Sequence, residues 1–130
     1  YNGSANVSMT NLVSNTGVVG TDVTGVGTVR YSLAACGYGE DKGIFGFGNP
    51  NGGEVSTTNL VSNTGVVATD TTGVGTGREG IAATQYGGDK GIFGYGSSLS
   101  TTNLISNVGV ASSDVSGVGT ARNQLAACSY

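Results

Sequence analysis

The sequence predicts an all-β fold of short antiparallel strands, and three observations carry this prediction. Glycine occurs 25 times in 130 residues, beside one proline and no tryptophan. Valine, threonine and tyrosine, which favour strands, fill the spaces between the glycines, and no segment requires a helix. One glycine-rich unit is repeated along the chain. We therefore expect a protein built from β-repeats.

The repeat is clearest at Thr10–Val19, which returns at 58–67 and, with small changes, at 102–111. The same positions hold asparagine, aspartate and arginine in each copy. These residues are Asn11, Asn59 and Asn103; Asp22, Asp70 and Asp114; and Arg30, Arg78 and Arg122. We predict repeats over about residues 1–29, 30–77 and 78–121, with 122–130 starting another, in a single domain or propeller segment 1–130.

Within the unit that starts at Arg30, the pattern predicts four strands. They are Leu33–Cys36, Lys42–Phe47, Thr57–Val61 and Val66–Thr69. Glycine turns at 37–41 and an Asn-Thr-Gly turn within 62–65 separate them. Four strands with such frequent turns are typical of a propeller blade, although units stacked in a line as a β-solenoid would also fit.

The order of arginine, small apolar strand, Asp-Lys, aromatic strand, variable loop and strand pair resembles the kelch repeat. It runs over Arg30–Gly48 and again over Arg78–Gly96. The resemblance implies β-propeller blades, about three four-stranded repeats of 44–48 residues. Two features differ from kelch: glycines alternate with aromatics at 45–48, and valine replaces the expected tryptophan. The regulator-of-chromosome-condensation type of propeller is therefore a neighbouring alternative.

The phrase Asp-Lys-Gly-Ile-Phe-Gly-Tyr-Gly at 89–96 also resembles repeat arrays of structural proteins from environmental phages. This resemblance implies a viral protein, in a virion or an extracellular setting. The third copy lacks a counterpart of the aromatic strand at 87–94, which would leave a sheet edge unpaired. We expect a homo-oligomer in which a second copy completes the ring, or completion by the rest of a longer repeat chain.

Charge and composition exclude several partners. Charged residues make up 10% of the chain and the net charge is −3, too little basic surface for nucleic acid or an anionic membrane. No apolar run is long enough to span a bilayer. The two cysteines, Cys36 and Cys128, are too few for a disulfide scaffold and lack the spacing of a zinc site.

The chain has no histidine, so most acid–base mechanisms and a galactose-oxidase-like copper site are excluded. We expect no enzyme, and no catalytic, cofactor-binding or metal residues. The repeated aspartates could in principle hold calcium, but one carboxylate per copy favours an Asx-type turn. The Gly25-Val26-Gly27 segment is followed by no lysine and no helix, which favours a turn over a phosphate loop.

Other side chains recur once per unit, which favours structural tasks. The arginines and the pairs Asp41-Lys42 and Asp89-Lys90 are predicted to link neighbouring blades. The tyrosines Tyr38, Tyr86 and Tyr130 are predicted to pack between blades, and the two cysteines to pack as small buried side chains that do not pair.

The variable positions are the predicted recognition surface. They are the opening 1–8, the loop 49–56 with its shorter counterpart 97–100, and the equivalent pairs 31–32, 79–80 and 123–124. The sequence thus predicts a non-catalytic structural or adhesive binding module, in a viral or extracellular fibre. The alternative is a carbohydrate-binding, lectin-like propeller with weak repeated sites, for which burial of Tyr38, Tyr86 and Tyr95 would be unfavourable.

Overall fold

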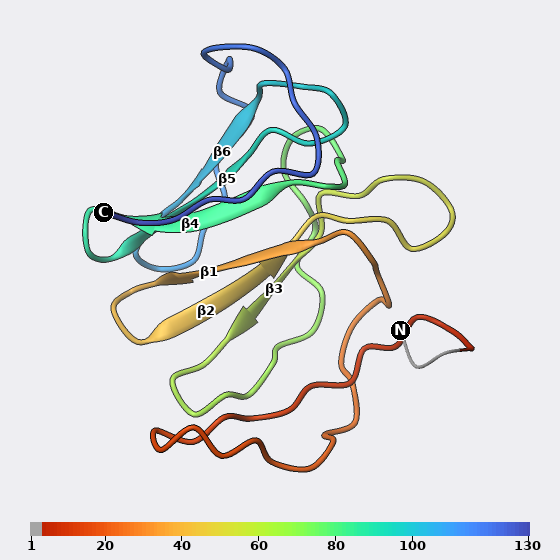
Figure 1. Cartoon of the computed structure of the whole chain (residues 1–130), viewed down its shortest axis with the longest axis vertical. Helices are drawn as coiled ribbons and strands as arrows, with labels where there is room; N and C mark the ends of the chain where they lie inside the picture. Colours follow the sequence, from red (N-terminus) through yellow and green to blue (C-terminus); the bar gives the residue numbers. More distant parts are fainter. Residues whose placement is uncertain (1–3) are drawn as a thin grey trace.

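The computed structural model describes residues 4–130, and the described chain is all-β. It contains six strands: β1 Ala34–Tyr38, β2 Lys42–Gly46, β3 Thr58–Val61, β4 Ala82–Tyr86, β5 Lys90–Gly94 and β6 Thr102–Ile105. They form two antiparallel sheets, β1-β2-β3 and β4-β5-β6, which lie one above the other (Figure 1). The described residues contain no helix, and so none that could cross a membrane.

The two sheets have the same register, as the repeat predicts. In the first sheet Ala34 lies opposite Gly46 and Tyr38 opposite Lys42, and Ala82 and Tyr86 have the equivalent partners in the second. The turn between β1 and β2 uses positive φ at Gly39 and Glu40, 55° and 70°. Two consecutive left-handed residues suit the twist of a tight hairpin.

The predicted fourth strand at Val66–Thr69 is wrong as a continuous strand. This segment runs beside β3 but pairs only through single bridges, Val61 with Val67 and Thr58 with Thr71. Between these two bridges the chain advances four positions, from 67 to 71, while β3 advances three, from 58 to 61; the extra residue is a bulge. The Asn59 side chain lies beside the irregular segment and donates to the carbonyl of Ala68 at 3.2 Å, which holds it in place.

The sheets pack on each other by placing side chains over glycines. The Phe93 ring of β5 covers Gly46 of β2, where an added Cβ would lie 3.0 Å from Phe93 Cζ. In the opposite direction, Cys36 of β1 covers Gly91 of β5. Phe93 also meets the ring of Phe47, with centroids 5.3 Å apart. These contacts form the centre of the buried core, because Ile44, Phe47 and Phe93 are almost completely buried.

Segments at the two ends follow the same arrangement without completing a sheet. Residues 10–23 form a bridged hairpin beneath the first sheet, and the Leu12 side chain lies over Gly65 as Leu60 lies over Gly109. The C-terminal segment 125–130 runs along β4 (Figure 1). The described residues therefore form stacked sheets but no closed ring, so the all-β prediction is confirmed at this coarser level.

Candidate functional site

The variable pairs and the two variable loops predicted as a recognition surface lie together on one edge of the stack. The opening 1–8 does not join them: residues 1–3 lie outside the described residues, and Val7 and Ser8 line a cavity beside the first sheet. The amide of Gly80 donates to the carbonyl of Ser32 at 3.0 Å, and the amide of Gln124 donates to that of Gly80 at 2.8 Å. The variable pairs 31–32, 79–80 and 123–124 therefore form a hydrogen-bonded column across successive units. Sequence comparison of the copies finds these positions, but only the fold makes them neighbours.

The two variable loops join this column. The Ser97 hydroxyl donates to a carboxylate oxygen of Glu54 at 2.8 Å, which links the longer loop of one unit to the shorter loop of the next. The Ser97 amide also approaches Asn123 Oδ1 at 3.3 Å. We call these loops and the column the variable edge. Its chemistry is polar, with a carboxylate, hydroxyls and amides on exposed backbone turns.

Behind this edge, Arg30 and Arg78 each anchor a polar network that reaches from their own unit to a threonine of the preceding unit. Arg30 Nη2 donates to Asn59 Oδ1 at 2.5 Å, and Asn59 donates on to Asp70 at 2.7 Å. The Asp70 carboxylate also accepts hydrogen bonds from the amide and the hydroxyl of Thr28, at 3.0 and 2.6 Å. The second unit repeats the network with Arg78, Asn103, Asp114 and Thr76.

These networks correct two predictions. Asp70 and Asp114 form no local Asx turn, because their partners lie 42 and 38 residues earlier in the chain. The arginine hydrogen bonds lie within a unit, whereas the contact with the neighbouring unit is a stack of the Arg78 guanidinium on the Phe47 ring, 4.8 Å from its centroid. The Asp-Lys pairs are also local, with Lys42 and Lys90 each bonded to the preceding aspartate.

The electrostatics of the networks follow from burial and hydrogen bonding. Burial lowers the pKa of the Arg78 guanidinium, and the nearby Asp114 carboxylate opposes that shift. The Thr76 hydroxyl has the largest effect and lowers the pKa of Asp114 by donating to its charged form; burial opposes this, and the Asn103 amide lowers the pKa further. Both groups remain charged near neutral pH, so the network is a structural clamp.

The recurring tyrosines and cysteines behave differently from copy to copy. Tyr38 is 3% exposed and packs against the loop of the next unit at Gly109, whereas Tyr86 is 38% exposed and Tyr130 is fully exposed. Tyr95 is half-buried beneath Arg122. Cys36 is half-buried and Cys128 exposed, both free, so burial of Cys128 was wrongly predicted. Packing between units is confirmed for Tyr38 alone.

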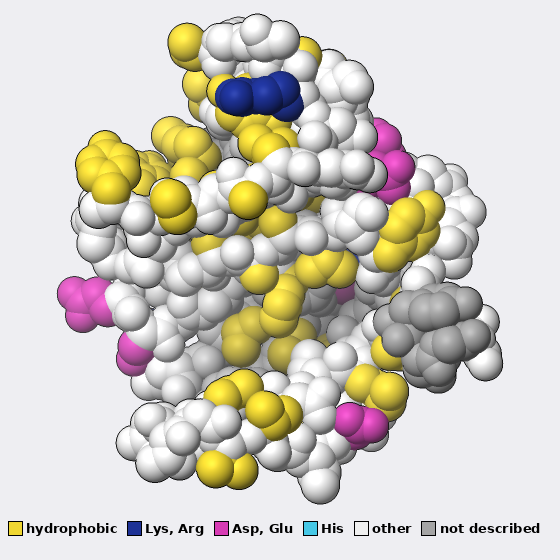
Figure 2. Space-filling model, in the orientation of Figure 1, with side chains coloured by type: hydrophobic (Ala, Val, Ile, Leu, Met, Phe, Trp, Pro, Cys, Tyr) yellow, Lys and Arg dark blue, Asp and Glu magenta, His cyan; other side chains and the backbone are white. Residues whose placement is uncertain are grey.

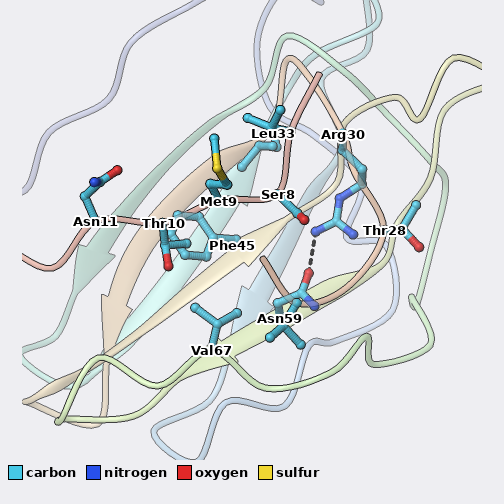
Figure 3. Close-up of a pocket in the computed structure, with 12 residues that line it drawn as sticks. Ser8, Met9, Thr10, Asn11, Thr28, Arg30, Leu33, Phe45, Asn59 and Val67 are labelled. Atoms are coloured by element: carbon cyan, nitrogen blue, oxygen red, sulfur yellow. Dashed lines mark hydrogen bonds between the residues drawn. The ribbon is translucent and has the colours of Figure 1, made fainter. Parts of the chain in front are cut away.

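A cavity of about 380 Å³ lies between residues 7–11 and the first sheet. Figure 2 shows this recess, with hydrophobic side chains inside it, above the N-terminal segment. Phe45, Met9 and Val67 supply apolar wall, and Arg30, Asn59 and Asn11 supply polar wall (Figure 3). The Arg30 side chain is almost completely buried, and its Nε has no hydrogen-bond partner among the described residues.

A second groove, of about 290 Å³, lies between the second sheet and the C-terminal segment. Six residues that line it are Thr84, Ile92, Gly94, Tyr95, Leu125 and Ala126. We call it the upper groove. No group of three or more Cys, Asp or Glu side chains that could hold a metal occurs within residues 4–130.

No protein-family model matches this sequence, and no curated protein matches it either. Function must therefore be argued from the geometry of the repeats.

Proposed function

We propose that this chain is a non-catalytic structural or adhesive binding module of kelch-like propeller blades, part of a viral or extracellular fibre. The observation that carries the proposal is the variable edge, where positions that differ between copies form one surface on an otherwise repeated framework. Recurring residues such as Arg78 and Phe93 are used for cohesion, and the residues that vary lie exposed or half-buried on one edge. This separation is typical of repeat proteins that present a binding surface.

The framework supports this role because its cohesive contacts can be repeated indefinitely. The Phe93-over-Gly46 contact and the Arg78–Phe47 stack join one unit to the next. The Arg–Asn–Asp–Thr network adds a further link, because its threonine belongs to the preceding unit. A stack of such units gains stability from every added neighbour, as a fibre component requires.

A chain extended by one unit tests the framework. We would append a copy of residues 39–86 after Tyr130, which continues the repeat in phase. The free energy of unfolding should rise and Tyr86 should become buried, because the appended copy of Gly65 would face it as Gly109 faces Tyr38; urea denaturation and tyrosine fluorescence read both. An appended unit that melts separately, with no gain in stability, would contradict the proposal.

Longer extensions test the blade arrangement. In a propeller, the radius of gyration from X-ray scattering should stop rising once the ring closes, at about four to eight blades. In a β-solenoid it should continue to rise with every unit. The second result would retain the structural module but overturn the propeller.

Replacing residues 49–56 by the four-residue loop 97–100 tests the variable edge. The free energy of unfolding should change little, because long exposed loops cost little closure entropy. Adhesion to a panel of bacterial cells should change. Unfolding of the variant would show that the loop is part of the framework, contrary to the proposal.

Carbohydrate binding is the second candidate, and the cavity favours it. The Phe45 ring and the hydroxyl-bearing Ser8 and Thr10 line the same recess, and aromatic faces with nearby hydroxyls are suited to sugars. A glycan array is the test, with Phe45→Ala as the variant and the loop replacement as the control. Loss of binding in the loop variant alone would favour the variable edge over the cavity.

A further inference from the structure

The upper groove repeats, with one element absent, the interface that joins the two sheets. Residues 126–130 are equivalent to β1, because Arg122 is equivalent to Arg30 and the copies are in register. In the first sheet, β1 pairs along its length with β2. Among residues 4–130, no backbone hydrogen bond involves 125–130. This segment has the sequence position of β1 and, among the described residues, unpaired backbone groups beside the groove.

The floor of the groove is equivalent to a surface that holds a phenylalanine elsewhere in the chain. Gly46, Phe47 and Cys36 surround the incoming β5 strand between the sheets, with Phe93 over Gly46. Their equivalents are Gly94, Tyr95 and Thr84, and all three line the upper groove. A Cβ added at Gly94 would meet only Thr102, at 3.5 Å, so the space over this glycine is open.

The arginine that completes the surface is also in place. The Arg122 guanidinium stacks on the Tyr95 ring at 4.5 Å, as Arg78 stacks on Phe47. Ile92 is half-buried, whereas its equivalent Ile44 is covered by the second sheet. Gly94, Tyr95 and the Arg122 stack thus have the arrangement of Gly46, Phe47 and the Arg78 stack in the filled interface.

We propose that the upper groove binds, in trans, an extended strand of the form Lys-Gly-Ile-Phe-Gly-aromatic presented by another repeat of this type. The strand pairs antiparallel with 126–130 and places its phenylalanine over Gly94, against the Tyr95 ring. By the register of β1 and β2, its isoleucine lies opposite Cys128, as Ile44 lies opposite Cys36. This inference rests on the proposed structural module and names the segment that such a module captures.

The backbone edge provides affinity and the phenylalanine provides selectivity, as in other β-strand additions. A strand without the aromatic side chain would pair but leave the space over Gly94 empty. A strand with a larger residue before the isoleucine would lose the close approach that glycine permits at position 91, where an added Cβ would lie 2.6 Å from Cys36 Sγ.

A labelled peptide with the sequence of residues 87–96 tests binding to the whole chain, by fluorescence anisotropy with cysteines reduced. We expect saturable binding with Kd below about 1 mM. Replacing the peptide phenylalanine by alanine, or Gly94→Val in the protein, should weaken binding at least about tenfold. Gly52→Ala is the matched control, because an added Cβ there meets nothing within 4 Å. Absence of binding, or binding that Gly94→Val leaves unchanged, would overturn the proposal.

Thiol exchange tests the register independently. In the Cys36→Thr variant, which carries the residue found at Thr84, Cys128 is the remaining thiol. A peptide with Ile92→Cys, activated as a mixed disulfide with thionitrobenzoate, should be attacked by the Cys128 thiolate, forming the protein–peptide disulfide and releasing thionitrobenzoate. The rate should exceed that of an equally activated Lys90→Cys peptide at least about tenfold, because by the same register that cysteine lies opposite Tyr130, two residues away from Cys128. Equal rates would contradict the register.

The extended chain separates this inference from the proposed function. If appending residues 39–86 stabilises the protein but the free peptide does not bind, capture in trans fails and the structural module stands. If the appended unit gives no stabilisation, the proposed function itself fails.

Discussion

The covered face of the first sheet and the open face of the second have equivalent residues in different environments. Ile44 and Tyr38 are buried where the second sheet covers them, whereas their equivalents Ile92 and Tyr86 are half-buried and exposed. Local sequence is almost the same, so the difference comes from the neighbour alone. The recurring residues of a unit therefore form one side of an interface, and they become buried only where the next unit supplies the other side.

Truncating a phenylalanine gives the largest expected contrast. Phe93→Ala should lower the free energy of unfolding by about 3–5 kcal/mol, because Phe93 is completely buried between the sheets. Phe45→Ala, at the equivalent position, should cost about half as much or less, since Phe45 lines a cavity. Urea denaturation measures both. Phe93→Leu serves where the alanine variant does not fold, and equal losses at both positions would break the comparison.

The arginines give the next contrast. Arg78→Ala should cost about 3 kcal/mol, because it leaves the Thr101 carbonyl and the Asn103 side chain without their buried donor. Arg122→Ala should cost about 0.5–1 kcal/mol, since only its exposed stack on Tyr95 is lost. Thermal unfolding followed by circular dichroism would show whether the two variants separate in this order.

Glycine substitution sharpens the comparison at the interface itself. Gly46→Ala should cost about 1–3 kcal/mol, because the new Cβ would lie 3.0 Å from the Phe93 ring. Gly94→Ala should change stability by no more than about 0.5 kcal/mol, as its surroundings are open. A destabilised Gly94 variant, measured in the same denaturant series, would mean that another part of the chain occupies the groove.

The aspartates of different units should differ in how their contribution to the free energy of unfolding depends on pH. The pKa of Asp114 is lowered chiefly by the Thr76 hydroxyl, so its contribution is present above the unfolded pKa of about 3.9 and is lost as the pH falls through the folded value. Asp114→Asn should cost about 1 kcal/mol at pH 7 and less at pH 3. Asp22→Asn should cost less at pH 7, because Asp22 accepts only from Asn11 among the described residues. Unfolding at both pH values gives the test.

Thiol labelling probes the comparison without altering the fold. Burial raises the pKa of Cys36 to about 11, whereas Cys128 is exposed. At pH 8, Cys128 should react with a chromogenic disulfide about 100-fold faster than Cys36, in proportion to the smaller thiolate fraction of Cys36. The two rates should converge in denaturant. Equal native rates would show that the second sheet does not cover β1 in solution.

The sequence predicted the strands better than the contacts between them. The repeat located β1, β2 and β3 to within two residues at each end, because glycine turns and strand-forming residues are local signals. The fourth strand was predicted as regular, whereas the structure bulges there, because the Asn59 side chain contacts it from β3. Side-chain bonding from another strand leaves no local sequence signal.

The candidate site was predicted in part for the same reason. Differences between copies identified the variable positions, since substitution is visible in a repeat without any structure. That Ser97 meets Glu54, and that the pairs near 32, 80 and 124 form one column, depends on how successive units stack. The cavity beside Phe45 and the upper groove were missed. The sequence signal that could have found them is the alternation of glycine with aromatic residues at 45–48 and 93–96, which lets an aromatic ring of one unit lie over a glycine of the next.

The sequence by itself determined the all-β class, the unit length and the residues that recur, because strand propensity, turns and repetition are properties of neighbouring residues. Only the tertiary structure decided that Phe93 lies over Gly46, that Asp70 binds Thr28 across 42 residues, and that the equivalent surface at Gly94 is open. These contacts join residues distant in the chain. Their free energy depends on the packing of whole sheets, which local propensity does not encode.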